Sequence, residues 1–119
     1  MASKRLSVKQ IKLLNQHRYI LKNLESASAK DRRDILKNAP PQLFKVLNLV
    51  FKLLNEKQLE LSSHQTRVVN KHKRLIRSAS GLKGAKMQQK MVKQRGGALS
   101  TILSVALPVI TSLIQSLLK

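Results

Sequence analysis

The sequence feature that most limits the fold is a run of 21 residues, 98–118, that contains no charged side chain. It follows the glycine pair Gly96-Gly97, and the chain before that pair is largely polar and basic. As a single helix the run would be about 31 Å long, close to the hydrocarbon thickness of a bilayer. Any fold of this chain must therefore give an apolar helix a partner, which is lipid, the rest of the chain or another copy.

The pattern inside this run leaves the choice of partner open. A narrow strip of small and polar residues follows one side of the expected helix, and Pro108 is expected to kink it. The strip consists of Ser100, Ser104, Pro108, Thr111 or Ser112, and Gln115. The candidate membrane or assembly residues fill the other sides: Leu99, Ile102, Leu103, Leu107, Ile110, Leu113, Ile114 and Leu117. Such a helix suits packing in lipid or at a membrane surface, and equally suits a further bundle helix or a seam between copies.

Positive charge is concentrated just before the apolar run. The chain carries 24 Lys and Arg against 5 Asp and Glu, a formal net charge of +19. Residues 62–95 hold ten of the cations and no acid. This imbalance favours a polyanionic partner, either nucleic acid or an anionic membrane surface. Aromatic residues are limited to Tyr19, Phe44 and Phe51, so a platform of rings that stacks single-stranded bases is not expected.

Capping residues and apolar spacing indicate where helices begin and end. Three serine caps predict three helices: Ser7 with Gln10 for 7–26, Ser28 for 29–38, and Ser62 with Gln65 for 63–79. Residues 42–55 follow Pro40-Pro41 and are apolar nearly all round, which is typical of a central helix packed on several sides. Residues 86–95 have few apolar side chains, and we expect a frayed helix or no regular structure there.

These elements predict an all-α fold, a small bundle of four helices plus a C-terminal hydrophobic helix. Three segments are expected along the chain: a basic helical bundle (1–80), a basic linker that contains glycines (81–97) and the hydrophobic tail helix (98–119). A length of 119 residues suits one small domain.

Residues that could perform catalysis or bind a metal are not grouped in the sequence. The five acids lie on polar helix faces or in loops, and none pairs with a histidine at a useful spacing. His64 and His72 are about two helical turns apart, too far for a shared metal ion. The chain has no cysteine, and neither residues 81–84 nor Gly96-Gly97 have the spacing of a phosphate-binding loop. The sequence therefore predicts a protein that is not an enzyme and needs no cofactor or metal.

The acid-free basic segment carries the strongest chemical signal. Lysine and arginine neutralise phosphates and release counterions without reading a base sequence. Because no motif here would read bases, we expect non-specific contact with a phosphate backbone, foremost that of double-stranded DNA. The cluster 71–74 with Arg77 also fits a nuclear import signal. The candidate nucleic-acid-binding residues are Arg67, Lys71, Lys73, Arg74, Arg77, Lys83, Lys86, Lys90, Lys93 and Arg95.

Several segments, taken in order, resemble one group of proteins. They are Gln16-His17-Arg18 with Leu21 and Leu24, Arg32-Arg33-Asp34-Ile35-Leu36, Leu61-Ser62 with His72-Lys73 and Leu75-Ile76-Arg77, and Lys90-Met-Val-Lys-Gln-Arg-Gly-Gly97 before the apolar tail. Over most of residues 10–118 the chain resembles the small basic proteins of adintoviruses and Polinton/Maverick elements. The resemblance implies a structural protein of a virion or a mobile element.

The end of the chain is in turn similar to the adenovirus core protein precursor, in which Gly-Gly and an apolar stretch follow a basic DNA-condensing peptide. There the viral protease releases the apolar stretch, which implies a processing site here at Gly96, Gly97 and Ala98, with the bond after Gly97 cut. The protease pattern has an aliphatic residue or Met where Gln94 stands in this chain. An uncut tail would instead resemble the amphipathic helix of the membrane-lytic adenovirus capsid protein.

The predicted function is that of a non-enzymatic viral or mobile-element structural protein that binds and condenses DNA through phosphate contacts. The tail adds two alternatives. One is a membrane-active or membrane-anchored protein, and the other is an assembly protein that docks to a capsid protein or forms a homo-oligomer through the tail. The expected location is the virion or the host nucleus, with a host membrane as the alternative.

Overall fold

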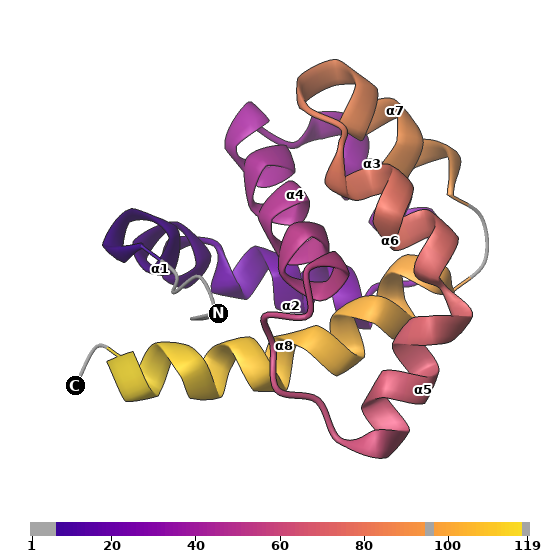
Figure 1. The fold of residues 1–119 in the computed structure, drawn as a ribbon. Coiled ribbons are helices and arrows are strands. Elements are labelled where there is room, and N and C mark those ends of the chain that lie inside the picture. The colour runs from indigo at the N-terminus through magenta and orange to yellow at the C-terminus, as the bar shows by residue number, and fades with distance from the viewer. Residues whose placement is uncertain (1–6, 95–96, 118–119) are drawn as a thin grey trace.

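The computed structural model describes residues 7–94 and 97–117, and these residues form eight α-helices and no strand (Figure 1). The helices are α1 (Val8–Gln16), α2 (Arg18–Ser26), α3 (Ala29–Asn38), α4 (Pro41–Asn55), α5 (Ser63–Lys71), α6 (Lys73–Ser80), α7 (Gly84–Lys93) and α8 (Ala98–Leu117). The predicted all-α class is confirmed, but the predicted count of four helices plus a tail helix is wrong. The difference arises at two single-residue breaks and in the basic linker.

Two of the predicted helices are each divided at a histidine. His17 has φ −106° and ψ 10°, and His72 has φ −115° and ψ 20°, so both leave helical geometry. The next helix starts at once, because the carbonyls of His17 and His72 accept the amides of Leu21 and Ile76 at 3.0 Å. The apolar spacing continues across both histidines, and the periodicity alone therefore predicts unbroken helices.

The basic linker contains a further helix, α7. Met87 and Met91 lie about one turn apart and are 0% and 1% exposed, which anchors the helix in the core. The side-chain amide of Gln88 donates to the carbonyls of Leu36 and Lys37 at the end of α3, at 3.2 Å each. This segment is therefore an anchored helix, in contrast to the frayed or unstructured segment expected from its composition.

Helix α4 is central, as predicted. Ten of its 15 residues are buried, and it packs against α1, α6 and α7. The buried residues include Phe44, Val46, Leu47, Val50 and Phe51, each at most 3% exposed. Burial on nearly every side explains why this helix lacks the polar face of a surface helix.

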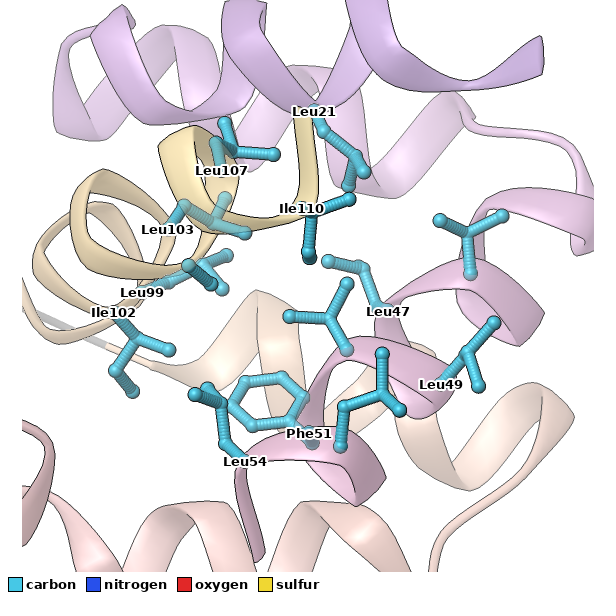
Figure 2. Packing of buried hydrophobic residues seen from close by; sticks show 14 of the residues in the cluster. Leu21, Leu47, Leu49, Phe51, Leu54, Leu99, Ile102, Leu103, Leu107 and Ile110 are labelled. Atoms are coloured by element: carbon cyan, nitrogen blue, oxygen red, sulfur yellow. The ribbon is translucent and has the colours of Figure 1, made fainter. Parts of the chain in front are cut away.

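Helix α8 lies in the same core. Leu99, Ile102, Leu103, Ile110 and Ile114 are at most 3% exposed, and the helix packs on α2, α5 and α1. Side chains from α2, α4 and α8 point into one interior space (Figure 2). The strip of small and polar residues on α8 is exposed or half-buried. In this structure the uncharged run is thus a further helix of the bundle.

Arg32 joins α3 to the C-terminal end of α2. Its side chain is 9% exposed, and it donates from Nε to the carbonyl of Leu24 at 3.0 Å and from Nη2 to that of Ala27 at 2.8 Å. The last carbonyls of a helix have no partner within the helix, so a donor from elsewhere must satisfy them when they are covered. This cation therefore serves the fold and is not available to a polyanion.

Asn48 makes the equivalent connection between α4 and the C-terminal end of α6. Although this residue is polar, its side chain is only 8% exposed. Its Nδ2 shares its two N–H groups among three carbonyls, those of Ala79 at 3.2 Å, Ser80 at 3.0 Å and Leu82 at 2.6 Å. The contact fixes the position of α6, which carries part of the basic surface described below.

Candidate nucleic-acid interface

The predicted phosphate-contacting cations lie on three consecutive helices. Arg67 and Lys71 are on α5, Lys73, Arg74 and Arg77 on α6, Lys83 immediately before α7, and Lys86, Lys90 and Lys93 on α7. All nine are exposed except Lys90, which is half-buried. Arg95 lies outside the described residues. The structure therefore leaves the side chains of the other nine cations accessible to a large polyanion.

The cations of α6 share one face of that helix. Arg77 is four residues after Lys73 and three after Arg74, so the three side chains lie over one another. Ile76 and Ala79 occupy the opposite face and are buried where α6 packs on α4. The division of α6 into a buried apolar face and a cationic outer face follows from this spacing alone.

Two surface hollows are lined by these cations, and the second also brings in a cation from another part of the chain. Lys73, Arg74 and Arg77 line the first with Ser78. Lys73 and Arg77 also contribute to the second, where they meet Lys57 from beyond the end of α4. A phosphate group in either hollow would face several cationic donors, which is the arrangement that binds phosphate strongly. The lysines of α7 do not line these hollows; that helix packs on α3 and α4 and extends the basic surface.

Lys57 is a member of this site that the sequence pattern does not reveal. Its φ of +57° lies in the left-handed region, which is uncommon for a residue with a side chain. The amides of Lys57 and Gln58 bond to the carbonyls of Leu54 and Leu53 at 3.2 and 2.9 Å, which is a Schellman motif. Glycine is the usual residue at this position, so only the tertiary structure places a cation here.

Some of the basic residues also stabilise the helices that carry them. Lys71, Arg77, Lys90 and Lys93 lie in the last turns of α5, α6 and α7. Cations at these positions interact favourably with the negative end of the helix dipole. Their placement therefore has a structural benefit in addition to any role in binding.

Most of the candidate membrane or assembly residues are in the core. Leu99, Ile102, Leu103, Leu107, Ile110 and Ile114 are buried, Leu113 is half-buried, and the side chain of Leu117 lies outside the described part of the chain. One described helix is long and apolar enough to cross a membrane, namely α8, with a mean hydropathy of 1.8 over Ala98–Ser116. In this apolar stretch 39% of the residues are buried, and the core helix of a soluble protein can be equally long and apolar.

The expected processing site lies at the start of α8. Gly97 is exposed and its carbonyl accepts the amide of Thr101 at 2.8 Å, while Ala98 is half-buried. Gly96 falls outside the described residues. Leu99, two residues beyond the expected scissile bond, is 2% exposed. A protease that binds its substrate in an extended form would have to unwind the first turn of α8 to reach this bond.

Within residues 7–94 and 97–117, no three His, Asp or Glu side chains lie close enough together to hold a metal ion. Comparisons with known proteins found no match to this chain, whether among family models, curated proteins or solved structures. The basic surface of α5–α7 is therefore the feature with the clearest chemical consequence.

Proposed function

We propose that this protein binds and condenses double-stranded DNA without reading its sequence, as a structural protein of a virion or mobile element. The observation that supports the proposal is the exposed basic surface of α5–α7, in a segment of the chain that contains no acid. The resemblance to the small basic proteins of adintoviruses and Polinton/Maverick elements supports the proposed role as a structural protein of a virion or mobile element. Each lysine or arginine that neutralises a phosphate releases a condensed counterion, which favours binding.

The hollows on and beside α6 suggest how the backbone is held. Arg74 and Arg77 can each offer two parallel N–H donors to a phosphate, and Lys73 adds a flexible charge between the two hollows. Contacts of this kind position a duplex but carry no sequence information. Neutralised DNA segments repel one another less, and the same contacts therefore favour condensation.

A gel-shift titration over a range of salt concentrations tests the proposal. The logarithm of affinity should fall by about 0.9 per unit of log salt for each phosphate engaged. Arg77→Gln should reduce that slope by about one phosphate and weaken binding to all sequences alike. Arg33→Gln is the matched control, because Arg33 is an exposed arginine on α3, outside this surface. Absence of binding, or binding that salt does not weaken, would end the proposal.

A membrane-active role is the second proposal, and the length and apolar composition of α8 favour it. Since α8 packs in the core, insertion into lipid requires that it first be released. Leu47 of α4 is 0% exposed, so Leu47→Ala loosens the core without changing the sequence of α8. Leakage of anionic liposomes should rise in this variant above the level of the exposed control Lys45→Ala. Equal leakage from both variants would contradict release of α8 as the mechanism.

A further inference from the structure

Residues 7–26 and 62–81 are two copies of one structural unit. Four residues recur 55 positions apart: Ser7 as Ser62, Gln10 as Gln65, Asn15 as Asn70 and His17 as His72. In each unit the serine and glutamine form a capping box, a nine-residue helix follows, the histidine interrupts it, and a second helix begins at the next residue. The two breaks described above are therefore a repeated feature of the fold.

Burial follows the same register in both units. Leu14, Leu21 and Leu24 are buried, and so are their counterparts Val69, Ile76 and Ala79. Of the twenty paired positions, only three differ in whether the residue is buried, half-buried or exposed. Because both units turn the same positions toward the core, they also turn the same positions toward solvent.

The two units pack on the same pair of central helices, α4 and α8. In the first unit α1 contacts both central helices and α2 packs on α8; in the second, α5 packs on α8 and α6 on α4. Figure 1 shows α1 at the left of the molecule, α5 and α6 at the right and α4 between them, while α8 runs across the molecule and passes beneath α1. Helix α1 of the first unit and helices α5 and α6 of the second therefore lie on different sides of the protein.

The outer cations are repeated as well. Three cations of the second unit pair with cations of the first: Arg67 with Lys12, Lys73 with Arg18, and Arg77 with Lys22. Lys12 and Lys22 are exposed and Arg18 is half-buried. Residues 7–24 also contain no acid. The first unit thus presents a cationic side with the same register as the basic surface of α5 and α6.

A surface hollow occurs at the same register in each unit. Arg18, Tyr19 and Lys22 line a hollow beside α2, and these three positions pair with those of Lys73, Arg74 and Arg77, which line the hollow on α6. The guanidinium carbon of Arg18 lies 5.2 Å from the centroid of the Tyr19 ring. The equivalence therefore extends from sequence and burial to the shape of the surface.

The first hollow differs from the second in two respects. Leu107 and Pro108 of α8 add apolar groups to its lining, and Glu25 adds a carboxylate where the second unit has Ser80. A carboxylate repels phosphate, so the first unit should hold DNA less tightly than the second.

We propose that the outer side of α1 and α2 is a second binding face for the DNA backbone, and that one molecule joins two duplexes. This inference rests on the proposed function. Two faces on different sides of one small protein draw separate duplexes together, whereas a single face only coats one of them. Bridging is thus the route by which this chain condenses DNA.

A two-duplex capture assay tests the proposal. A duplex fixed to beads captures a second, fluorescent duplex only when the protein holds both. The variants are Lys12→Glu with Lys22→Glu for the first face and Arg67→Glu with Arg77→Glu for the second. The control is Lys30→Glu with Arg33→Glu on α3. All six residues are exposed and every variant changes the charge equally, and far-ultraviolet circular dichroism checks that each variant keeps the helical content of the unaltered protein.

Both face variants should lose capture of the fluorescent duplex by about tenfold relative to the control, because each has lost two phosphate contacts on one face. Each should still shift a single duplex in a gel. Capture by the first-face variant equal to that of the control would overturn the second face. Failure of the unaltered protein to bind any duplex would instead overturn the proposed function, so the two failures are distinguishable.

Fluorescence gives a second readout that needs no variant. Tyr19 is the one tyrosine of a chain without tryptophan, it is 71% exposed, and it lies on the first face. Quenching of its emission by acrylamide should therefore fall when excess duplex occupies both faces. Unchanged quenching at saturating duplex would show that DNA does not cover α2 and would overturn the proposal.

Discussion

Ending the chain at Gly97 removes α8 and, with it, six large aliphatic side chains from the core. These are Leu99, Ile102, Leu103, Leu107, Ile110 and Ile114, each at most 9% exposed. Full burial of such a side chain contributes about 1.5–3 kcal/mol, so the six together contribute about 9–18 kcal/mol. A domain of this kind has a total stability of about 5–15 kcal/mol. We therefore expect the shortened chain to lose cooperative folding.

Far-ultraviolet circular dichroism and urea denaturation measure this effect. The full chain should unfold in one transition, whereas the shortened chain should have a weaker helical signal and no clear midpoint. Ile102→Ala provides a graded version, with an expected loss of about 2–5 kcal/mol because a fully buried side chain is truncated. Gln115→Ala, at an exposed position of the same helix, is the matched control and should leave the midpoint unchanged.

A shortened chain that keeps its helical signal and its urea midpoint would refute this reasoning. It would show that α1–α7 form a complete core and that α8 is free to enter lipid or to be removed. Loss of folding would instead mean that cleavage after Gly97 releases an unstable basic segment.

Three further predictions concern polar residues that contact or follow the C-terminal ends of helices. Asn48→Leu removes the donor to three carbonyls at the end of α6, and urea denaturation should show a free energy of unfolding lower by about 2 kcal/mol. Asn55→Leu, at an exposed position of the same helix, is the control and should leave the free energy of unfolding unchanged. Arg32→Met keeps the apolar stem but removes both donors to the end of α2, and should lower the free energy of unfolding by about 1–3 kcal/mol. Arg33→Met, at the exposed neighbouring position, should change the free energy of unfolding by about zero. Midpoints that do not move would show that water satisfies these carbonyls. Lys57→Gly should raise stability by about 0.5–1 kcal/mol because glycine accepts the left-handed conformation, while Lys57→Ala should not; both should reduce the salt slope of DNA binding by about one phosphate. Equal stability of the two variants would show that the turn is not strained.

Local sequence signals were reliable for the starts of helices. Each of the three predicted serine caps accepts the amide three residues further on, at 3.1 or 3.2 Å. The predicted helix over 29–38 has the bounds found for α3. The breaks at His17 and His72 were not predictable in this way, because they leave the apolar spacing intact. They could have been suspected from the recurrence of Ser, Gln, Asn and His at the same intervals in both units.

The candidate site was predictable in part, because the outward direction of a side chain on a helix follows from local spacing. Outer cations such as Arg77 follow from helical spacing, since a residue three or four positions from another cation and off the apolar stripe must face outward. Lys57 reaches the site through a turn with a positive φ, and Arg32 is withdrawn from the surface by carbonyls of a different helix. Neither fact follows from the spacing of apolar and charged residues along a helix, so neither was predicted from the sequence.

By itself the sequence determined that the chain is helical, where most helices begin and where charge collects, because these properties depend on residues within one or two turns of each other. Only the tertiary structure decided that the uncharged helix α8 (Ala98–Leu117) packs mainly against α2 and α5. It also decided that α7 is anchored by Met87 and Met91, and that two similar units pack on the same central helices, α4 and α8. The physical reason is that an apolar helix has the same composition whether lipid or protein surrounds it. Its surroundings are set by contacts between residues far apart in the chain.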